Sequence, residues 1–151
     1  MEDLSLHVLD LAENAIRAKA KKISIAIREE TEKDRLTICI CDDGRGMDGE
    51  MVARALDPFF TTKRGKKVGL GLALFAQAAQ ETGGDLQIES RPGGGTQVTA
   101  HFVLSHPDMK PVGSMSETLA TLITGNPAIR FVFDQDEGGH RAHFDSHNCG
   151  Q

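Results

Sequence analysis

A carboxylate, a carboxamide and a cation recur at helical spacing near the start of the chain. Asp10, Asn14 and Arg17 are four and three residues apart, so on a helix their side chains emerge from one face as a column. A carboxylate can take up a proton as a general base, and an amide oxygen is a ligand that hard divalent cations accept. The same column is typical of the solvated face of an ordinary helix, so its meaning depends on the rest of the chain.

A second candidate site is the turn Asp42-Asp43-Gly44-Arg45-Gly46-Met47, which ends an alternating apolar segment. Two glycines around a single residue allow the backbone to turn tightly and to approach a planar ligand closely. A carboxylate at the strand end can accept a hydrogen bond from an exocyclic amine. An ordinary acidic Asp-Gly turn has the same composition.

Three further stretches favour an anionic ligand or a tight turn. Residues 57–67, DPFFTTKRGKK, are too polar and cationic to pack as core, and we expect them to be mobile until an anion neutralises them. Gly69-Leu70-Gly71-Leu72 opens a helix, and the free amides of a glycine-rich helix start attract anions. PGGGT at 92–96 makes a turn between two strands. A solvent-exposed basic loop and a plain hairpin turn remain as alternatives.

Taken in order, these motifs resemble the N, G1, F, G2 and G3 boxes of the Bergerat-fold (GHKL) ATP-binding domain. That domain is shared by sensor histidine kinases, the gyrase B subunit, Hsp90 and MutL. The resemblance is closest to the histidine-kinase catalytic domain and covers residues 4–104. It implies an α+β fold, a two-layer α/β sandwich with a mostly antiparallel mixed sheet, helices on one face and a mobile ATP lid.

The resemblance also implies the ligand and its contacts. ATP would bind with Mg²⁺ on the Asn14 amide oxygen, with Asp42 on the adenine amino group and with Gly46 beneath the base. The other implied nucleotide contacts are Arg17, Gly44, Met47, Phe60, Thr62, Lys63, Gly69, Leu70, Gly71, Leu72 and Thr96. For Thr96, the role would be to support the pocket, and a hairpin turn alone explains it nearly as well.

Within the lid, Phe59 or Phe60 would anchor the hinge, and Lys63, with Lys66 or Lys67, would reach the phosphates. Lys67 stands where the family pattern has a further glycine.

The chain has acidic residues at two positions where the family varies. Asp43 stands where many members carry Asn, which adds charge near the phosphates. Asp10 aligns with a glutamate that activates water in the gyrase and MutL branch, whereas many histidine kinases have asparagine there. Asp10 is therefore a candidate general base toward water or a substrate hydroxyl. Equally, it could orient Asn14 or pair with Arg17, and Glu13 beside the column is a less favoured substitute.

The elements that would position these residues follow from periodicity. Leu4, Val8, Leu11 and Ala15 form an apolar stripe and predict a helix over 4–18. Residues 23–27 and 36–40 alternate and predict an antiparallel hairpin packed on that helix. Further helices are predicted at 49–56 and from 69 to the Gly83-Gly84 pair, and further strands at 86–90 and 97–104.

Residues 105–151 lie outside the resemblance, and we expect them to form an appendage of domain 1–104, not an independent domain. A short helix capped by Ser116 and a hairpin are predicted there, covering a sheet edge or presenting a partner surface. Zinc ligands could come from His140, His143, His147 and Cys149. Their spacing matches no common zinc pattern, which favours an ordinary polar terminus.

The composition limits the classes of function. At 151 residues and a net charge of −5, the chain has the size of one domain and lacks the basic character of nucleic-acid binders. No apolar run is long enough to span a membrane, and the acidic start is unlike a signal segment. We therefore expect a cytoplasmic protein. Cys39 and Cys41 are poorly placed for a disulfide along one strand, so reduced thiols are expected.

The function predicted from these features is transfer of the ATP γ-phosphoryl group to a partner protein in trans, as part of signalling. His7 is not followed by the acid and proline pattern of a phosphoacceptor histidine, so the acceptor is expected on another protein. The kinase would be of the histidine-kinase type or similar to the anti-sigma serine kinases. The alternative is a nucleotide-controlled binding module or slow ATPase. The oligomeric state stays open.

Overall fold

The computed structural model describes residues 3–57 and 70–147. The chain runs through α1 (Leu4–Arg17), β1 (Lys22–Glu30), the short 3₁₀ helix η1 (Thr31–Lys33), β2 (Arg35–Asp42) and α2 (Gly49–Ala55). It continues through α4 (Leu70–Glu81), β3 (Asp85–Ser90), β4 (Thr96–Val103), α5 (Met115–Gly125), β5 (Arg130–Glu137) and β6 (His140–Asp145). These elements agree with the sequence prediction to within a few residues at their ends.

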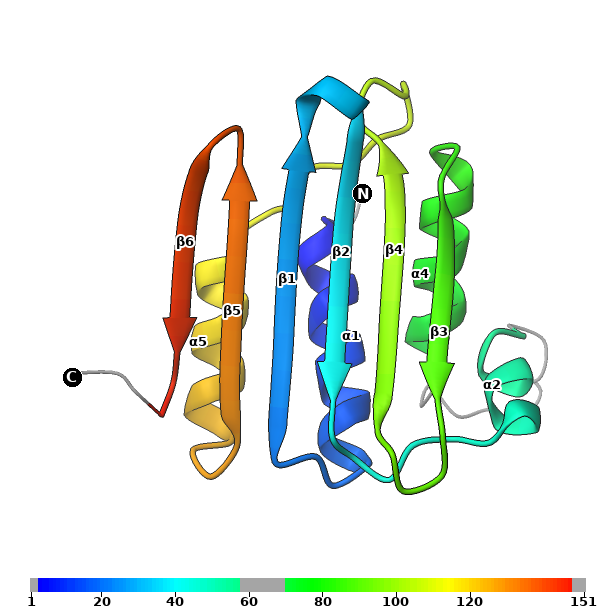
Figure 1. Cartoon of the computed structure of the whole chain (residues 1–151), viewed down its shortest axis with the longest axis vertical. Helices are drawn as coiled ribbons and strands as arrows, with labels where there is room; N and C mark the ends of the chain where they lie inside the picture. Colours follow the sequence, from blue (N-terminus) through cyan, green and yellow to red (C-terminus); the bar gives the residue numbers. More distant parts are fainter. Residues whose placement is uncertain (1–2, 58–69, 148–151) are drawn as a thin grey trace.

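The strands form one mixed six-stranded sheet in the order β3-β4-β2-β1-β5-β6 (Figure 1). All neighbours are antiparallel except β1 and β5, which run parallel. Helices α1, α4 and α5 lie side by side on one face of this sheet, and α2 lies at its β3 edge (Figure 1). The predicted two-layer sandwich with a mostly antiparallel mixed sheet is confirmed.

Alternation along the strands creates the core between the two layers. Successive side chains of a strand point to opposite faces, so every second residue of the central strands turns toward the helices and is buried. The buried set includes Ile23, Ile25, Ile27, Leu36, Ile38, Ile40, Val98, Ala100 and Phe102. The predicted stripe of α1, from Leu4 to Ala15, packs onto this layer and is buried as well. One face of α1 is thereby fixed on the sheet, which leaves its polar column to one side.

The C-terminal segment continues the same sheet. Strand β5 pairs with β1 along its whole length, and β6 forms the new outer edge. The connection before α5 also holds the start of α1, because the Leu4 and Ser5 N–H groups donate to the carbonyl oxygens of Pro111 and Val112 at 3.0 and 2.7 Å. The predicted helix and hairpin are present. The predicted cap was wrong by two residues: Ser114, not Ser116, accepts the Glu117 N–H with its side chain.

Among the described residues, none of the helices has both the length and the apolar composition required to cross a bilayer.

Candidate functional site

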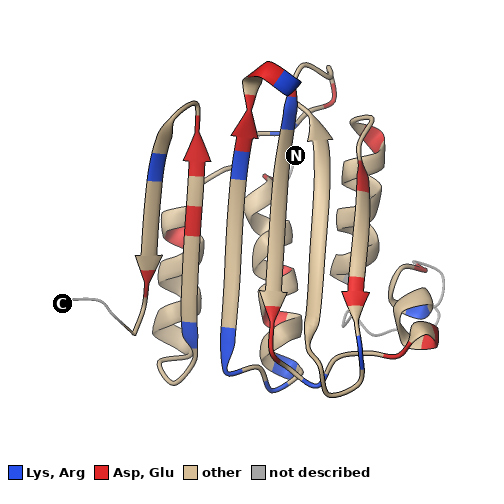
Figure 2. Ribbon diagram, in the orientation of Figure 1, with Lys and Arg blue, Asp and Glu red and all other residues tan. Residues whose placement is uncertain are grey.

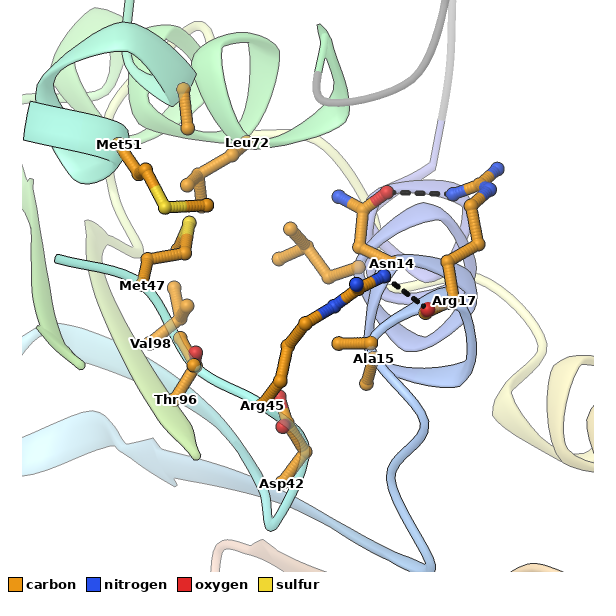
Figure 3. Close-up of a pocket in the computed structure, with 14 residues that line it drawn as sticks. Asn14, Ala15, Arg17, Asp42, Arg45, Met47, Met51, Leu72, Thr96 and Val98 are labelled. Carbon is orange, nitrogen blue, oxygen red and sulfur yellow. Dashed lines mark hydrogen bonds between the residues drawn. The ribbon is translucent and has the colours of Figure 1, made fainter. Parts of the chain in front are cut away.

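A cavity of about 310 Å³ opens where the last turns of α1 face the end of β2. Its other walls come from α2, the first turn of α4 and the start of β4 (Figure 3). The lining residues are Leu11, Asn14, Ala15, Arg17, Ala18, Asp42, Arg45, Gly46, Met47, Met51, Ala55, Leu72, Thr96 and Val98. The cavity thus gathers residues from nearly the whole length of the predicted nucleotide domain.

The polar column of α1 is divided between two places. Asn14 and Arg17 line the cavity, and the Arg17 guanidinium Nη1 donates to the Asn14 amide oxygen at 2.8 Å (Figure 3). Asp10, one turn earlier, packs against the start of α4: a Cβ atom added to Gly71 would lie 2.9 Å from the Asp10 Cβ. Gly71 therefore permits the close approach of α1 and α4 that places Asp10 at the first turn of α4.

Asp42 is the carboxylate of the cavity. It ends β2, is half-buried, and accepts a hydrogen bond from the Gly44 N–H at 2.8 Å. Burial raises the pKa of the Asp42 carboxyl above its ordinary value, and the nearby Asp43 charge raises it further, against the lowering effect of the Gly44 bond. A half-buried carboxylate with one such donor retains acceptor capacity for a second donor, as an exocyclic amine would supply.

The glycines of the turn after β2 are required by close packing. A Cβ at Gly44 would lie 2.8 Å from the Ala18 carbonyl oxygen, and one at Gly46, where φ is +70°, would overlap the Arg91 carbonyl. The turn between β3 and β4 is therefore pressed against the turn after β2. The Gly93 N–H donates to the Arg45 carbonyl at 2.6 Å and joins them further.

Thr96 takes part in the hydrogen bonds that support the turn after β2. The Ser90 hydroxyl lies 2.8 Å from the Thr96 hydroxyl, and the Met47 N–H donates to Ser90 Oγ at 2.8 Å. Thr96 also lines the cavity. The threonine is thus part of a hydrogen-bonded group that holds the backbone of Met47 in place.

Apolar side chains make up the wall opposite α1. Met47, Met51, Leu72 and Val98 face Asn14 and Ala15 across the cavity (Figure 3). Two apolar walls with a carboxylate at one end suit a flat aromatic ring with an amine on its edge. Met51 and Val98 were missed from sequence, as were Leu11, Ala15, Ala18, Arg45 and Ala55. For Met51 and Ala55, the signal was available: they are four residues apart and so share a face of the predicted helix 49–56.

Asp43, predicted to add charge near the phosphates, does not line the cavity. Its carboxylate accepts the backbone N–H groups of Lys21 and Lys22 at 2.7 and 3.0 Å. The bond from the Lys22 N–H is the largest cause of a lowered pKa of Asp43. Burial opposes it, and the bond from the Lys21 N–H lowers the pKa further. Asp43 therefore fastens the start of β1 and does not line the cavity.

The remaining predicted contacts divide into two groups. Gly44 and Gly71 shape the backbone next to the cavity without lining it, and Leu70 begins α4. The predicted lid lies outside the described residues, and with it the candidates Phe59, Phe60, Thr62, Lys63, Lys66, Lys67 and Gly69.

The end of the sheet that carries the cavity bears both basic and acidic residues (Figure 2). Lys22 begins β1, Arg130 begins the parallel strand β5, and Arg17 ends α1 beside them. Arg45 and Arg91 stand in the two joined turns. The opposite end, around η1 and the β5–β6 turn, carries mainly Glu and Asp (Figure 2). Asp42, Asp43 and Glu89 lie at the cavity end as well, so attraction of an anionic ligand to the cavity depends on Arg17 and Arg45, which line it.

The donor set fits Mg²⁺ in the manner usual for nucleotide sites. Mg²⁺ commonly takes one or two oxygen ligands from protein and the rest from water and phosphate. The Asn14 amide oxygen is such a ligand at the cavity wall. Among the described residues, no group of three or more His, Cys, Asp or Glu side chains forms a closed metal site. Asn14 is therefore the residue that would hold the ion together with a bound phosphate chain.

The comparisons with known proteins agree with this geometry. The model of the family "Histidine kinase-, DNA gyrase B-, and HSP90-like ATPase" matches residues 2–106. The chain belongs to this family. That is the GHKL class, as the ordered motifs had predicted.

The names of three curated relatives describe a sensor protein and two sensor kinases. The chain is 42% identical over 93 residues to "Sensor protein kinase FleS" of Pseudomonas aeruginosa, which covers 61% of this chain and 23% of the relative. It is 34% identical over 103 residues to a "Putative sensor protein" of Shewanella frigidimarina, covering 67% and 16%. "Sensor kinase CckA" of Brucella abortus is 30% identical over 125 residues, covering 76% and 13%. The chain thus spans less than a quarter of the length of these relatives.

A solved structure shares the fold. The ATPase domain of Aquifex aeolicus MutL, complexed with ADP, superposes with a TM-score of 0.56 at 20% identity, covering 90% of this chain and 61% of that one. The coverage of this chain extends beyond the family match.

Proposed function

We propose that the cavity beside α1 binds Mg-ATP. The observation that carries this proposal is that Asp42 and the hydrogen-bonded Asn14–Arg17 pair line one cavity together with apolar side chains. The adenine amino group would donate to Asp42, the ring would lie between Ala15 and Met47, and the phosphates would extend past Asn14 toward the start of α4. Membership in the ATPase family supports this orientation.

The proposed reaction is transfer of the γ-phosphoryl group to a partner protein in trans. The sensor kinases among the relatives support a signalling role with a protein partner. Phosphoryl transfer depends mainly on positioning and on charge neutralisation. In this proposal, Asn14 holds Mg²⁺, Arg17 neutralises phosphate charge, and Asp10 accepts the proton of the attacking hydroxyl or water from its place beside Gly71.

The second candidate function is a nucleotide-controlled binding module, which hydrolyses ATP slowly or not at all. The contact of Pro111 and Val112 with the first residues of α1 favours it. Through this contact, the helix that carries Asn14 is joined to a segment outside the family match. A nucleotide that shifts α1 would act on the surface formed by α5, β5 and β6.

Calorimetric titration with a non-hydrolysable ATP analogue tests the binding proposal. We expect Mg²⁺-dependent binding that Asn14→Ala weakens by roughly tenfold or more, because the variant removes the metal's protein ligand. Ala53→Ser, on the exposed side of α2, serves as the matched control and should bind as the wild type does. Tight Mg²⁺-dependent binding by the Asn14 variant would contradict the assignment.

Turnover separates the two candidate functions. If Asp10 is the base, Asp10→Asn abolishes phosphoryl transfer or hydrolysis while nucleotide affinity stays within about twofold. Unchanged turnover in this variant would exclude the role of Asp10. Binding without measurable turnover in the wild type, with candidate partners present, would favour the binding module.

A further inference from the structure

Arg45 is the cavity residue for which the motif offers no role. It is the residue between Gly44 and Gly46, and it is exposed while lining the cavity. Its guanidinium Nη2 donates to the Arg17 backbone carbonyl at 2.9 Å. The side chain therefore lies along the cavity wall, held at its far end by the last turn of α1.

The backbone of Arg45 is fixed on both sides. Its N–H donates to the Ala18 carbonyl at 2.9 Å, and its carbonyl accepts the Gly93 N–H at 2.6 Å. Gly44 and Gly46 are packed against neighbouring carbonyls with no room for a Cβ. A backbone held in this way presents the Arg45 side chain in one direction, at little further entropic cost on ligand binding.

The direction of the Arg45 side chain indicates which part of a bound ligand it contacts. The Arg45 side chain starts three residues after Asp42, and its guanidinium ends at the Arg17 carbonyl, in the last turn of α1, which follows Asn14 (Figure 3). Asp42 and Asn14 are the proposed contacts of the adenine base and of the metal-bound phosphates. A nucleotide that contacts both residues lies alongside Arg45. The part of the nucleotide next to Arg45 is the part that follows the sugar.

The charge of the Arg45 guanidinium indicates which chemical group of the ligand lies there. Only one guanidinium nitrogen is tied to Arg17, and a guanidinium carries five N–H donors with a charge that is never lost. Donors in such an arrangement match phosphate oxygens better than sugar hydroxyls. Arg17 and Arg45 then divide the phosphate chain, with Arg17 at Asn14 and Arg45 nearer the base.

We infer that Arg45 binds the α-phosphate of the nucleotide and makes the cavity select nucleotides over nucleosides. This inference rests on the proposed function. It predicts that affinity rises when the first phosphate is added to adenosine, even without Mg²⁺, and that this rise depends on Arg45.

The experiment compares adenosine, AMP and ADP without Mg²⁺ by competition against a fluorescent ADP analogue. In the wild type, we expect AMP to bind roughly tenfold more tightly than adenosine, the usual size of a charge-assisted contact. Arg45→Gln should reduce that ratio to near one and leave adenosine affinity within about twofold. Arg45→Lys, which keeps the charge but not the fork, should give an intermediate ratio.

Arg91→Gln is the matched control. Arg91 stands in the adjoining turn and lines a different hollow, so its loss removes the same charge without touching the cavity. The inference is overturned if Arg45→Gln leaves the ratio unchanged. It is also overturned if adenosine and AMP lose affinity equally, because Arg45 would then only hold α1 against the turn. If the wild type binds none of the ligands, the proposed function itself fails, which is a distinct result.

Discussion

The guanidinium of Arg17 donates to the amide oxygen of Asn14, the same oxygen that is proposed to hold Mg²⁺. The two residues stand three apart at the end of α1, so the contact forms within the helix itself. A fixed cation on a metal-ligand oxygen repels a second cation. The free protein should therefore bind a divalent ion weakly until phosphate draws Arg17 away.

Arg17→Met tests this competition. The variant keeps most of the aliphatic stem and removes the charge, so binding of Mn²⁺ to the nucleotide-free protein should strengthen several-fold. Affinity for ATP with Mg²⁺ should fall by roughly tenfold, because the phosphate loses a cation. Water-proton relaxation by Mn²⁺ measures the first effect and calorimetry the second. Unchanged Mn²⁺ affinity would mean that Arg17 does not shield Asn14.

Asp42 should govern recognition of the amine. Asp42→Ala removes the proposed acceptor of the adenine amino group, and we expect a loss of roughly tenfold to a hundredfold in ADP affinity. A nucleotide with unsubstituted purine in place of adenine lacks the amine and supplies the control. Its affinity should be weak in the wild type and little changed by the substitution. Equal losses for both nucleotides would assign Asp42 a structural role.

The pH dependence of ADP affinity follows from the same carboxyl. Burial raises the pKa of Asp42 in the free protein, and only the ionised carboxylate accepts a full charge-assisted bond from the amine. Affinity should therefore be greatest above this raised pKa and decline as the pH falls through it. The decline should begin at a higher pH than an ordinary Asp, with its pKa of about 3.9, would give. A titration series from neutral pH downward, with Asp42→Ala as the insensitive control, measures it.

The sequence predicted the layers of the fold because periodicity alone determines which faces are buried. Periodicity also placed Asn14 and Arg17 on one face of α1, whereas their selection with Asp42 and Met47 as site residues followed from the resemblance to the ATPase family. All four residues line one cavity. Side-chain direction in the turns did not follow from sequence. Asp43 turns to the β1 backbone because two free N–H groups lie there, and no local pattern encodes that contact.

Two other features depend on tertiary packing. Arg45 is hydrophilic and flanked by glycines, which is typical of a surface turn, and only the position of α1 makes it a cavity residue. Strand β5 could have paired with either edge of the sheet. It pairs with β1 because α5 packs beside α1, and the alternating pattern of β5 does not distinguish the two edges.

The ion pair of Arg130 and Asp145 should make the free energy of unfolding depend on pH in the acidic range. The Arg130 guanidinium Nε lies 3.1 Å from each Asp145 oxygen and holds the pKa of Asp145 at about 2, below its ordinary value. A lowered pKa stabilises the fold above the pKa of the unfolded chain, about 3.9, and this contribution is lost as the pH falls toward 2.

Asp145→Asn should therefore lower the free energy of unfolding near neutral pH, and its difference from the wild type should narrow between about pH 4 and pH 2. Denaturant titrations at several pH values measure both. Asp134→Asn, at an exposed carboxylate that contacts His143 on the same pair of strands, is the control. It should stay within about 0.5 kcal/mol of the wild type. A difference for Asp145→Asn that is constant with pH would contradict the ion-pair explanation.

Two glycines of the turn between β3 and β4 allow a paired test of what holds Asp42 in position. Gly93 and Gly95 both have φ of +77°, so alanine is strained by about 1–2 kcal/mol at either position. Nothing lies within 4 Å of a Cβ added to Gly93, whereas one added to Gly95 would overlap the Asp42 carbonyl oxygen. Gly95→Ala must therefore push the strand end that carries Asp42, and it should cost roughly 1–3 kcal/mol more than Gly93→Ala. Gly95→Ala should also weaken ADP binding in protein that remains folded, as judged by circular dichroism. Equal stabilities of the two variants would show that the turn can move away from β2 freely, and Asp42 would then owe its position to β2 alone.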